Sequence, residues 1–273
     1  MLAAWQVLGV ALLALGGLHA AVPTQEPATS GEARDLVVKA LERFAWNEEH
    51  RFETRHRSLM LREVRRFDSD GRVEEEDLGD YEVVPIDGAP YERRLTINGR
   101  LLSEEEQKGE RRREAEFREE LRRAYEAPDD AEEDDDGIVF NEELVGRYLF
   151  TLEAEELLRG RPSYRISFRP RAGRLPVRRR IDYALNKARG QVWIDQETFE
   201  AARVEFALIG KVRLWWGVAG TISQARGSLD RGPVLADIWA RLQLETYTDV
   251  RIFFSRTRRA ELRQWRDFEL IVE

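Results

Sequence analysis

The stretch from Gly190 to Trp216 constrains the fold of this chain more than any other, because its apolar residues recur with a period of two. Val192 and Ile194 fall on one side of a short run, and Trp193 falls on the other. After a polar, turn-like segment, apolar and charged residues alternate again between 203 and 208. A sheet with one buried and one wet face requires this period. The stretch therefore predicts a hairpin of a large antiparallel sheet.

Similar runs along the chain predict roughly ten strands in consecutive antiparallel order. The turns Asp68–Gly71, Asp87–Gly88 and Asn98–Gly99 mark hairpins in the first part, since such dipeptides fit tight hairpin loops. A further turn is predicted at 230–233. Residues 174–189 predict a short helix with Gly190 as its C-cap.

Two longer helices are predicted by the spacing of apolar residues. Glu32 to Trp46 has an apolar stripe, and Ser103 to Glu126 opens with the capping box Ser103–Glu106. An acidic loop, Asp129–Asp136, follows the second helix. Strands in meandering order with helices between them predict an α+β fold, with the helices on one side of a curved, largely antiparallel sheet.

The N-terminus predicts export. An apolar run ends at Leu18, and Ala20 and Ala21 offer small residues for cleavage of a signal peptide. Because no Lys or Arg precedes the run, an uncleaved N-terminal membrane anchor is the alternative. Both interpretations place the rest of the chain outside the cytoplasm, and the first makes it periplasmic. The predicted organisation is a signal peptide (1–21), a linker (22–31) and one domain (32–273) with a charged helical and acidic insertion at 103–137.

Composition excludes several chemistries. The chain has 273 residues and no cysteine, which rules out disulfides, thiolate catalysis and a lipoprotein anchor. A net charge of −8 argues against nucleic acid as a partner. His50 and His56, on one strand, would lie roughly 20 Å apart, too far for a shared metal. No G-x-S-x-G motif and no glycine-rich phosphate loop is present. We therefore predict no enzyme, no cofactor and no metal.

Seven tryptophans suggest an apolar ligand site. The candidate lining residues lie mostly in the C-terminal third: Trp193, Phe206, Leu208, Leu214, Trp215, Trp216, Ile222, Trp239, Leu244 and Phe253. For any single one of them, an ordinary sheet core covered by helices is the favoured explanation. Trp215 and Trp216 are adjacent, so on a regular strand one of them must face away from the core. The basic residues expected near an anionic headgroup are Arg178, Arg179, Arg180, Lys211 and Arg213.

An export signal followed by an amphipathic helix and meandering strands, with a strand ending in Ile194–Asp195 and leading into 199–206, resembles the periplasmic lipoprotein-carrier superfamily. That superfamily includes the lipoprotein-localisation carrier, its outer-membrane acceptor and an anti-sigma-factor regulator. The resemblance covers most of 32–271. It implies a half-barrel whose helices cover a concave, apolar cavity for acyl chains. The insertion at 103–137 and the basic run 169–180 depart from the pattern.

Two functions follow as expectations. The first is a periplasmic carrier that binds a lipid or an acylated lipoprotein in an apolar half-barrel cavity, with peripheral membrane contact. The second is an envelope protein-interaction or sensor module without a ligand cavity. A continuous apolar cavity would favour the first, and a filled core with an exposed patch would favour the second.

Overall fold

The structure is a computed structural model, and it describes residues 30–50, 52–126, 140–214, 220–236, 238–253 and 255–271. Its helices are α1 (Ser30–Glu49), the 3-10 turn η1 (Phe52–Thr54), α2 (Glu104–Glu126), α3 (Glu142–Gly146) and α4 (Asp182–Leu185). Its strands are β1 (His56–Phe67), β2 (Val73–Ile86), β3 (Ala89–Arg94), β4 (Thr96–Ile97), β5 (Arg100–Leu101), β6 (Tyr148–Leu158), β7 (Arg161–Pro170), β8 (Ala188–Asp195), β9 (Ala201–Leu208), β10 (Val212–Leu214), β11 (Gly220–Leu235), β12 (Ile238–Ile252) and β13 (Ser255–Leu270).

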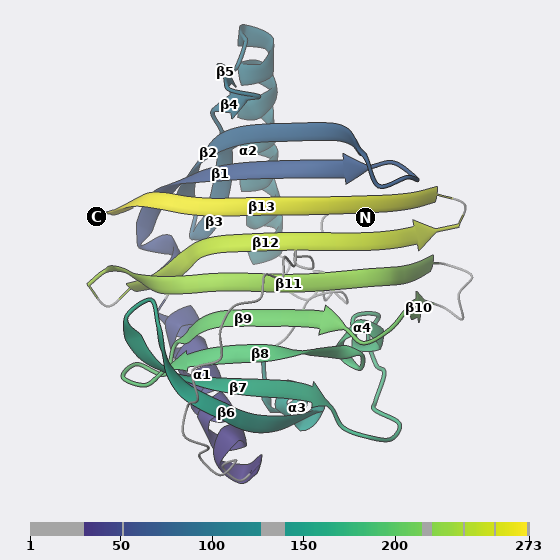
Figure 1. Ribbon diagram of the computed structural model, residues 1–273. Helices are drawn as coiled ribbons and strands as arrows, with labels where there is room; N and C mark the ends of the chain where they lie inside the picture. Colours follow the sequence, from purple (N-terminus) through teal and green to yellow (C-terminus); the bar gives the residue numbers. More distant parts are fainter. Residues whose placement is uncertain are drawn as a thin grey trace.

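One 11-stranded antiparallel sheet dominates the molecule, in the order β3-β2-β1-β13-β12-β11-β9-β8-β7-β6, with β10 paired to β11. The order follows the chain except where β13 inserts beside β1. The first strand of the chain, β1, and the last, β13, are therefore neighbours inside the sheet (Figure 1). The α+β class and the antiparallel sheet are confirmed. The half-barrel shape stays a prediction.

Helix α1 covers one end of the sheet. Ala33, Leu36 and Ala40 of α1 pack with Phe150 of β6 and Ile166 of β7 in a buried cluster. We call the side of the sheet that carries α1 the helix face. Helix α2 contacts β3 at the other end of the sheet, and both helices lie behind the sheet in Figure 1.

The first hairpins form as the turn sequences predict. Asp68 accepts hydrogen bonds from the backbone amides of Asp70 and Arg72 through its carboxylate, and the turn joins β1 to β2. At the next hairpin Asp87 and Gly88 both have positive φ, 48° and 82°. These are the left-handed angles that a type I′ turn needs.

Two local predictions are wrong. Residues 174–189 contain only the short helix α4, and Gly190 lies inside β8 rather than at a helix C-cap. A Cβ at Gly190 would lie 1.8 Å from the carbonyl oxygen of Glu205. Gly190 is therefore needed because β8 and β9 approach each other closely at this point. In the sequence alone, a glycine can indicate either such a close approach or a helix C-cap.

The turn predicted at 230–233 is also wrong, because β11 runs through it and pairs with β12 on both sides. Asp230 is buried and accepts from Arg159 and Arg203. Register shifts after Asp230 and after Pro233 show how the strand tolerates a proline, which a bulge permits.

The predicted signal peptide and the acidic loop Asp129–Asp136 lie outside the described residues, and the predicted domain limits stay a prediction. Among the described helices, none is long and apolar enough to cross a membrane.

Candidate functional site

The helix face changes character along a single cross-strand row. Starting at the α1 end, directly opposed residues on neighbouring strands are Leu152, Ile166, Val192, Val204, Leu229, Leu244, Arg263, Arg62 and Gly79. Opposed residues of antiparallel strands share a face. The row is therefore apolar from β6 to β12 and charged where β13 meets β1.

The middle of this row is an apolar strip, which we define as Val204, Phe206, Leu229 and Leu244. All four are half-buried, and none belongs to the two core clusters of the described residues. Phe206 faces Gly227, where a Cβ would lie 1.6 Å from the Phe206 ring. The glycine thus lets the aromatic ring lie directly against β11. The strip continues the core beyond the part that α1 packs against.

The charged end of the row is an arginine cluster, which we define as Arg62, Arg66, Arg259 and Arg263. Its centre is Glu261, whose side chain is 2% exposed. The carboxylate accepts from Arg62 Nε at 2.8 Å, Arg263 Nε at 2.7 Å and Arg259 Nη2 at 2.6 Å. Although burial raises the pKa of Glu261, the charges of Arg263, Arg62 and Arg259 hold that pKa below its usual value.

A polar hollow of about 440 Å³ opens beside this cluster. It is lined by Arg62, Val64, Arg66, Glu75, Glu76, Asp77, Tyr81, Arg94, Asn98 and Arg259. Nearly all of these side chains are polar or charged. The hollow therefore suits a hydrated or anionic group and does not suit an acyl chain.

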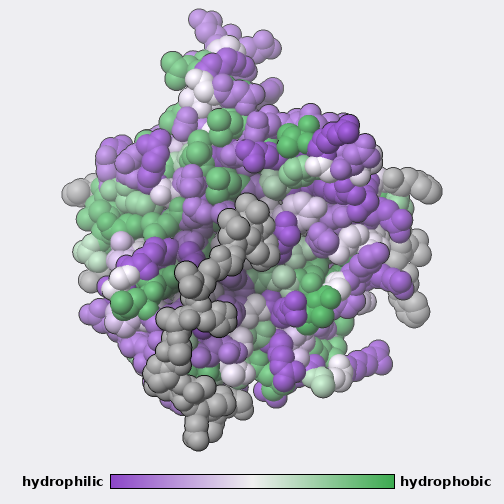
Figure 2. All heavy atoms as spheres, in the orientation of Figure 1, coloured by the Kyte–Doolittle hydropathy of each residue, from purple (hydrophilic) through white to green (hydrophobic). Residues whose placement is uncertain are grey.

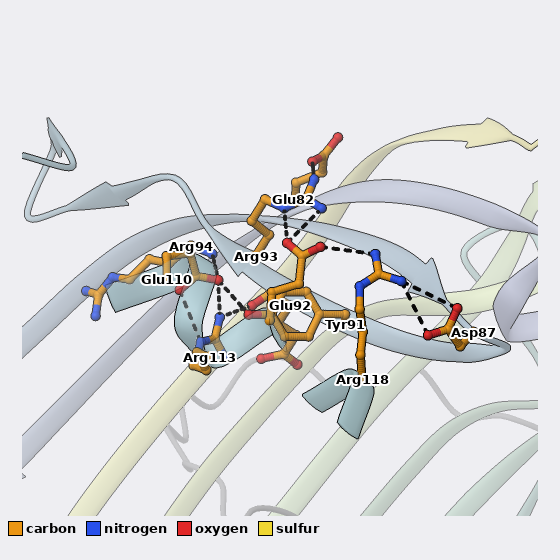
Figure 3. A network of polar contacts seen from close by, with 10 residues as sticks. Glu82, Asp87, Tyr91, Glu92, Arg93, Arg94, Glu110, Arg113 and Arg118 are labelled. Atoms are coloured by element: carbon orange, nitrogen blue, oxygen red, sulfur yellow. Dashed lines mark hydrogen bonds and ion pairs between the residues drawn. The ribbon is translucent and has the colours of Figure 1, made fainter. Parts of the chain in front are cut away.

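Helix α2 and β3 form a second polar site (Figure 3). Tyr91 donates through its hydroxyl to Glu110 at 2.8 Å, and Arg93 bridges Glu82 of β2 and Glu114 of α2. Burial and this hydrogen bond raise the pKa of Tyr91. The network holds a 23-residue helix that buries none of its own residues.

The network leaves a shallow hollow of about 270 Å³ between α2 and β3. Glu92, at its edge, also accepts from Arg263 Nη1 at 2.7 Å. The α2 site and the arginine cluster are therefore connected through one carboxylate.

The structure distributes the predicted apolar residues over separate places. Phe206 and Leu244 lie in the apolar strip, while Leu208 and Ile222 pack in a second cluster with Ala184 and Val212. Trp193 lies on the opposite face of the sheet and donates from Nε1 to Glu156 Oε1 at 2.7 Å.

The remaining candidates lie at strand ends. Trp239 is buried near the start of β12 beneath Arg161, and Phe253 is 66% exposed at the β12–β13 turn. Leu214 ends β10. The side chains of Leu214, Trp215 and Trp216 lie outside what the structure describes. The role of all ten residues as a ligand cavity stays a prediction.

The predicted basic residues gather at one corner of the sheet, where α4 contacts β10 (Figure 1). The amides of Arg178 and Arg179 donate to Asp182, a buried carboxylate that also pairs with Arg147. Although burial raises its pKa, these amides and the neighbouring arginines lower the pKa of Asp182. Lys211 and Arg213 are exposed near this corner. Their role in headgroup binding stays a prediction.

Sequence reasoning missed the arginine cluster, although a signal for it was present. Two sets of residues recur at every second position and therefore share one face of a strand: Arg62, Val64 and Arg66 in one strand, and Arg259, Glu261 and Arg263 in the other. Alternating charges on a strand usually indicate a solvent-exposed face. Their partners, however, come from strands nearly 200 positions away. Within the described ranges, no group of His, Asp or Glu side chains is arranged to hold a metal ion.

No protein-family model and no curated protein sequence matches this chain. Solved structures resemble it distantly. A DUF1329 family protein from Desulfovibrio piger is 13% identical, with 89% of this chain and 93% of that chain covered at a TM-score of 0.32. A LolA superfamily protein from Nitrosomonas europaea is also 13% identical, with 88% and 94% covered at 0.31.

A putative outer membrane lipoprotein-sorting protein domain from Vibrio parahaemolyticus is 11% identical, with 86% of this chain and 93% of that chain covered at a TM-score of 0.32. The match to lipoprotein-sorting domains is a distant structural one at low identity.

Proposed function

We propose that this protein is a non-enzymatic binding protein for an amphiphile, a lipid or an acylated protein, whose acyl part lies on the apolar strip. The observation that carries the proposal is the cross-strand row on the helix face. Val204, Leu229 and Leu244 continue the buried row of β6–β8 without belonging to the core that α1 completes. These apolar side chains remain only half-buried in the folded protein.

The energetics suit a reversible carrier. Each buried methylene contributes about 0.8 kcal/mol, so one acyl chain gives marginal and reversible binding. The polar hollow beside Arg259 marks where the apolar surface ends. A ligand that spans both regions must be amphiphilic, with its polar end towards β1 and β13.

The site of action that we propose is the bacterial envelope, because the N-terminal sequence predicts export. The partners that follow from this proposal are membrane lipids or acylated proteins, with peripheral membrane contact and no nucleic acid.

Two matched variants test the proposal. Leu244→Lys places a charge on the apolar strip, whereas Gln243→Lys places the same charge one residue earlier on β12, facing the other side of the sheet. We expect Leu244→Lys to abolish the tryptophan-fluorescence response to a neutral monoacylglycerol and Gln243→Lys to retain it. Circular dichroism of both variants controls for folding.

Native mass spectrometry of the protein purified from its own envelope provides an independent test. A stoichiometric acyl species is the expected result. A clean apo mass, together with no fluorescence response of the unmodified protein, would reject the amphiphile site.

A second function, a protein-interaction module, is favoured by α2. An ion pair connects this helix to β3, and Tyr125 near its C-terminal end is 64% exposed. Figure 2 presents the face of the sheet turned away from α2, and hydrophilic and hydrophobic residues are interspersed there.

The double variant Glu116→Lys/Glu120→Lys would test this second function at the hollow between α2 and β3. If α2 binds a partner, crosslinking in the envelope should yield one heterodimer that the double variant loses. Unchanged crosslinking would remove α2 as the docking site.

A further inference from the structure

The arginine cluster places like charges directly opposite each other. Arg66 of β1 faces Arg259 of β13, and Arg62 faces Arg263 four positions away along each strand. Opposed like charges on antiparallel strands destabilise the pair. A network whose only role was to hold β1 to β13 would alternate signs across the strands. The observed arrangement instead brings four guanidinium groups to one place.

The charge balance of the buried part is positive. Arg62, Arg259 and Arg263 share two carboxylates, Glu261 and Glu92. The acids at the rim of the hollow each have an arginine of their own. Glu75 pairs with Arg66 and Asp77 with Arg94. Glu76 stands directly opposite Arg65 and pairs with it on the other face of the sheet. Among the ion pairs of the described residues, one positive charge is therefore left in excess beside the hollow.

Arg259 carries this excess. Its Nη2 donates to Glu261, but its Nε is buried and has no acceptor among the described residues. Burial lowers the pKa of Arg259. Glu261 raises that pKa, Arg62, Arg263 and Arg66 lower it further, and the net shift is downward. A buried N–H without a partner is unfavourable. An anion in the hollow would supply both the missing acceptor and the missing charge.

We propose that the arginine cluster binds a phosphate-class oxyanion in the hollow beside Arg259. The proposal deepens the proposed function, because it names the polar end of the ligand that lies on the apolar strip. A lipid headgroup and a free phosphate share this chemistry. Guanidinium groups match it because their planar N–H donors bind phosphate oxygens in pairs.

The arrangement also sets the site apart from general surface charge. Arg65 and Arg66 are neighbours on β1, and each pairs with an exposed glutamate of β2; Arg65 also pairs with Glu63 of its own strand. Arg66 lines the hollow, whereas Arg65 lies on the other face of the strand. The chain therefore offers a matched control for a test of phosphate binding.

The experiment measures the binding of inorganic phosphate by calorimetry, at constant ionic strength set with chloride, for the full chain and three variants. We expect Arg259→Gln and Arg66→Gln each to weaken phosphate binding at least about tenfold, since each removes charge-assisted hydrogen bonds. Arg65→Gln should bind as the unmodified protein does. Arg66 is exposed, so its variant keeps the test valid if Arg259→Gln fails to fold.

Vesicles then separate the two sources of phosphate. Binding to phosphatidylglycerol vesicles that depends on Arg66, with little binding to phosphatidylcholine, would identify a lipid headgroup as the ligand. Phosphate binding without vesicle binding would identify a free phosphate. Either result supports the oxyanion site.

Two outcomes would overturn it. One is the absence of phosphate binding at millimolar concentration, and the other is an equal loss in Arg65→Gln and Arg66→Gln, which would indicate general surface charge. The neutral monoacylglycerol assay is independent of this site. Loss of acyl binding with phosphate binding intact would reject the amphiphile function and leave the oxyanion site standing.

Discussion

The two ends of the helix face use the same strand architecture in opposite ways. At the α1 end, Ile166 and Ile194 are fully buried under a helix, and close packing holds the strands together. At the β13–β1 junction, Glu261 is equally buried but is surrounded by arginines. Apolar burial is non-directional and needs no particular partner group, whereas a buried charge depends on each of its partners. The apolar end therefore resembles a scaffold, and the charged end resembles a site.

The largest effect is expected at the charged end. Glu261→Gln removes the carboxylate that Arg62, Arg259 and Arg263 share, and leaves Glu92, the ion-pair partner of Arg263, as the remaining acid among the described ion pairs of these arginines. We expect a loss of about 3–5 kcal/mol in the free energy of unfolding, as for other broken buried pairs. Urea denaturation measures the loss. Glu63→Gln, whose ion pair with Arg65 is more exposed, is the control and should change stability little.

The apolar end should respond strongly but without salt dependence. Ile166 is 0% exposed in the α1 cluster. Ile166→Ala is expected to cost about 2–5 kcal/mol through lost burial and the cavity that remains. Urea denaturation at low and high chloride compares this variant with Glu261→Gln. If Ile166→Ala were as sensitive to salt as Glu261→Gln, the distinction between the two ends would fail.

Acid should weaken the charged end first. The pKa of Glu261 is lowered in the folded protein, because three arginines outweigh the effect of its burial. The folded state therefore binds fewer protons than the unfolded state at low pH. The stability that Glu261 contributes is fully present above its ordinary pKa of 4.5 and is lost as pH falls below that value.

Denaturation curves between pH 6 and pH 3 test this direction, at roughly unit steps. The acid-induced loss in the unmodified protein should exceed that in Glu261→Gln, which has no carboxylate to protonate at this position. Parallel curves for the two proteins would contradict the assignment.

The smallest effect concerns α2. Ser103 and Glu106 cap this helix reciprocally, with Ser103 N to Glu106 Oε2 at 2.8 Å and Glu106 N to Ser103 Oγ at 3.3 Å. Ser103→Ala should destabilise α2 locally by about 1 kcal/mol. Hydrogen exchange of the first turn of α2 measures this change. Exchange in β6–β8 should stay the same, and a change there would mean that the two ends are coupled.

Local pattern determined much of the fold. The period of two identified the strands, and the Asp-Gly and Asn-Gly turns identified the hairpins around β1–β5. A β-turn comprises only four residues, so the residues that can adopt its left-handed backbone angles are visible in the local sequence. The capping box placed the start of α2 correctly. The same local cues misplaced Gly190 and the segment at 230–233, where a contact with a neighbouring strand overrides the turn or helix preference.

The site depended on the tertiary structure. The alternating arginines of β1 and β13 are visible in the sequence, but only the insertion of β13 beside β1 brings them together across about 200 positions. Likewise, the apolar residues predicted to line one cavity divide between two faces of the sheet. Successive residues of a strand face opposite sides, and Trp193 therefore lies on the other face of the sheet from Phe206. Sequence fixes which residues share a side of one strand. Which strands become neighbours, and therefore which charges meet, is a property of the folded sheet alone.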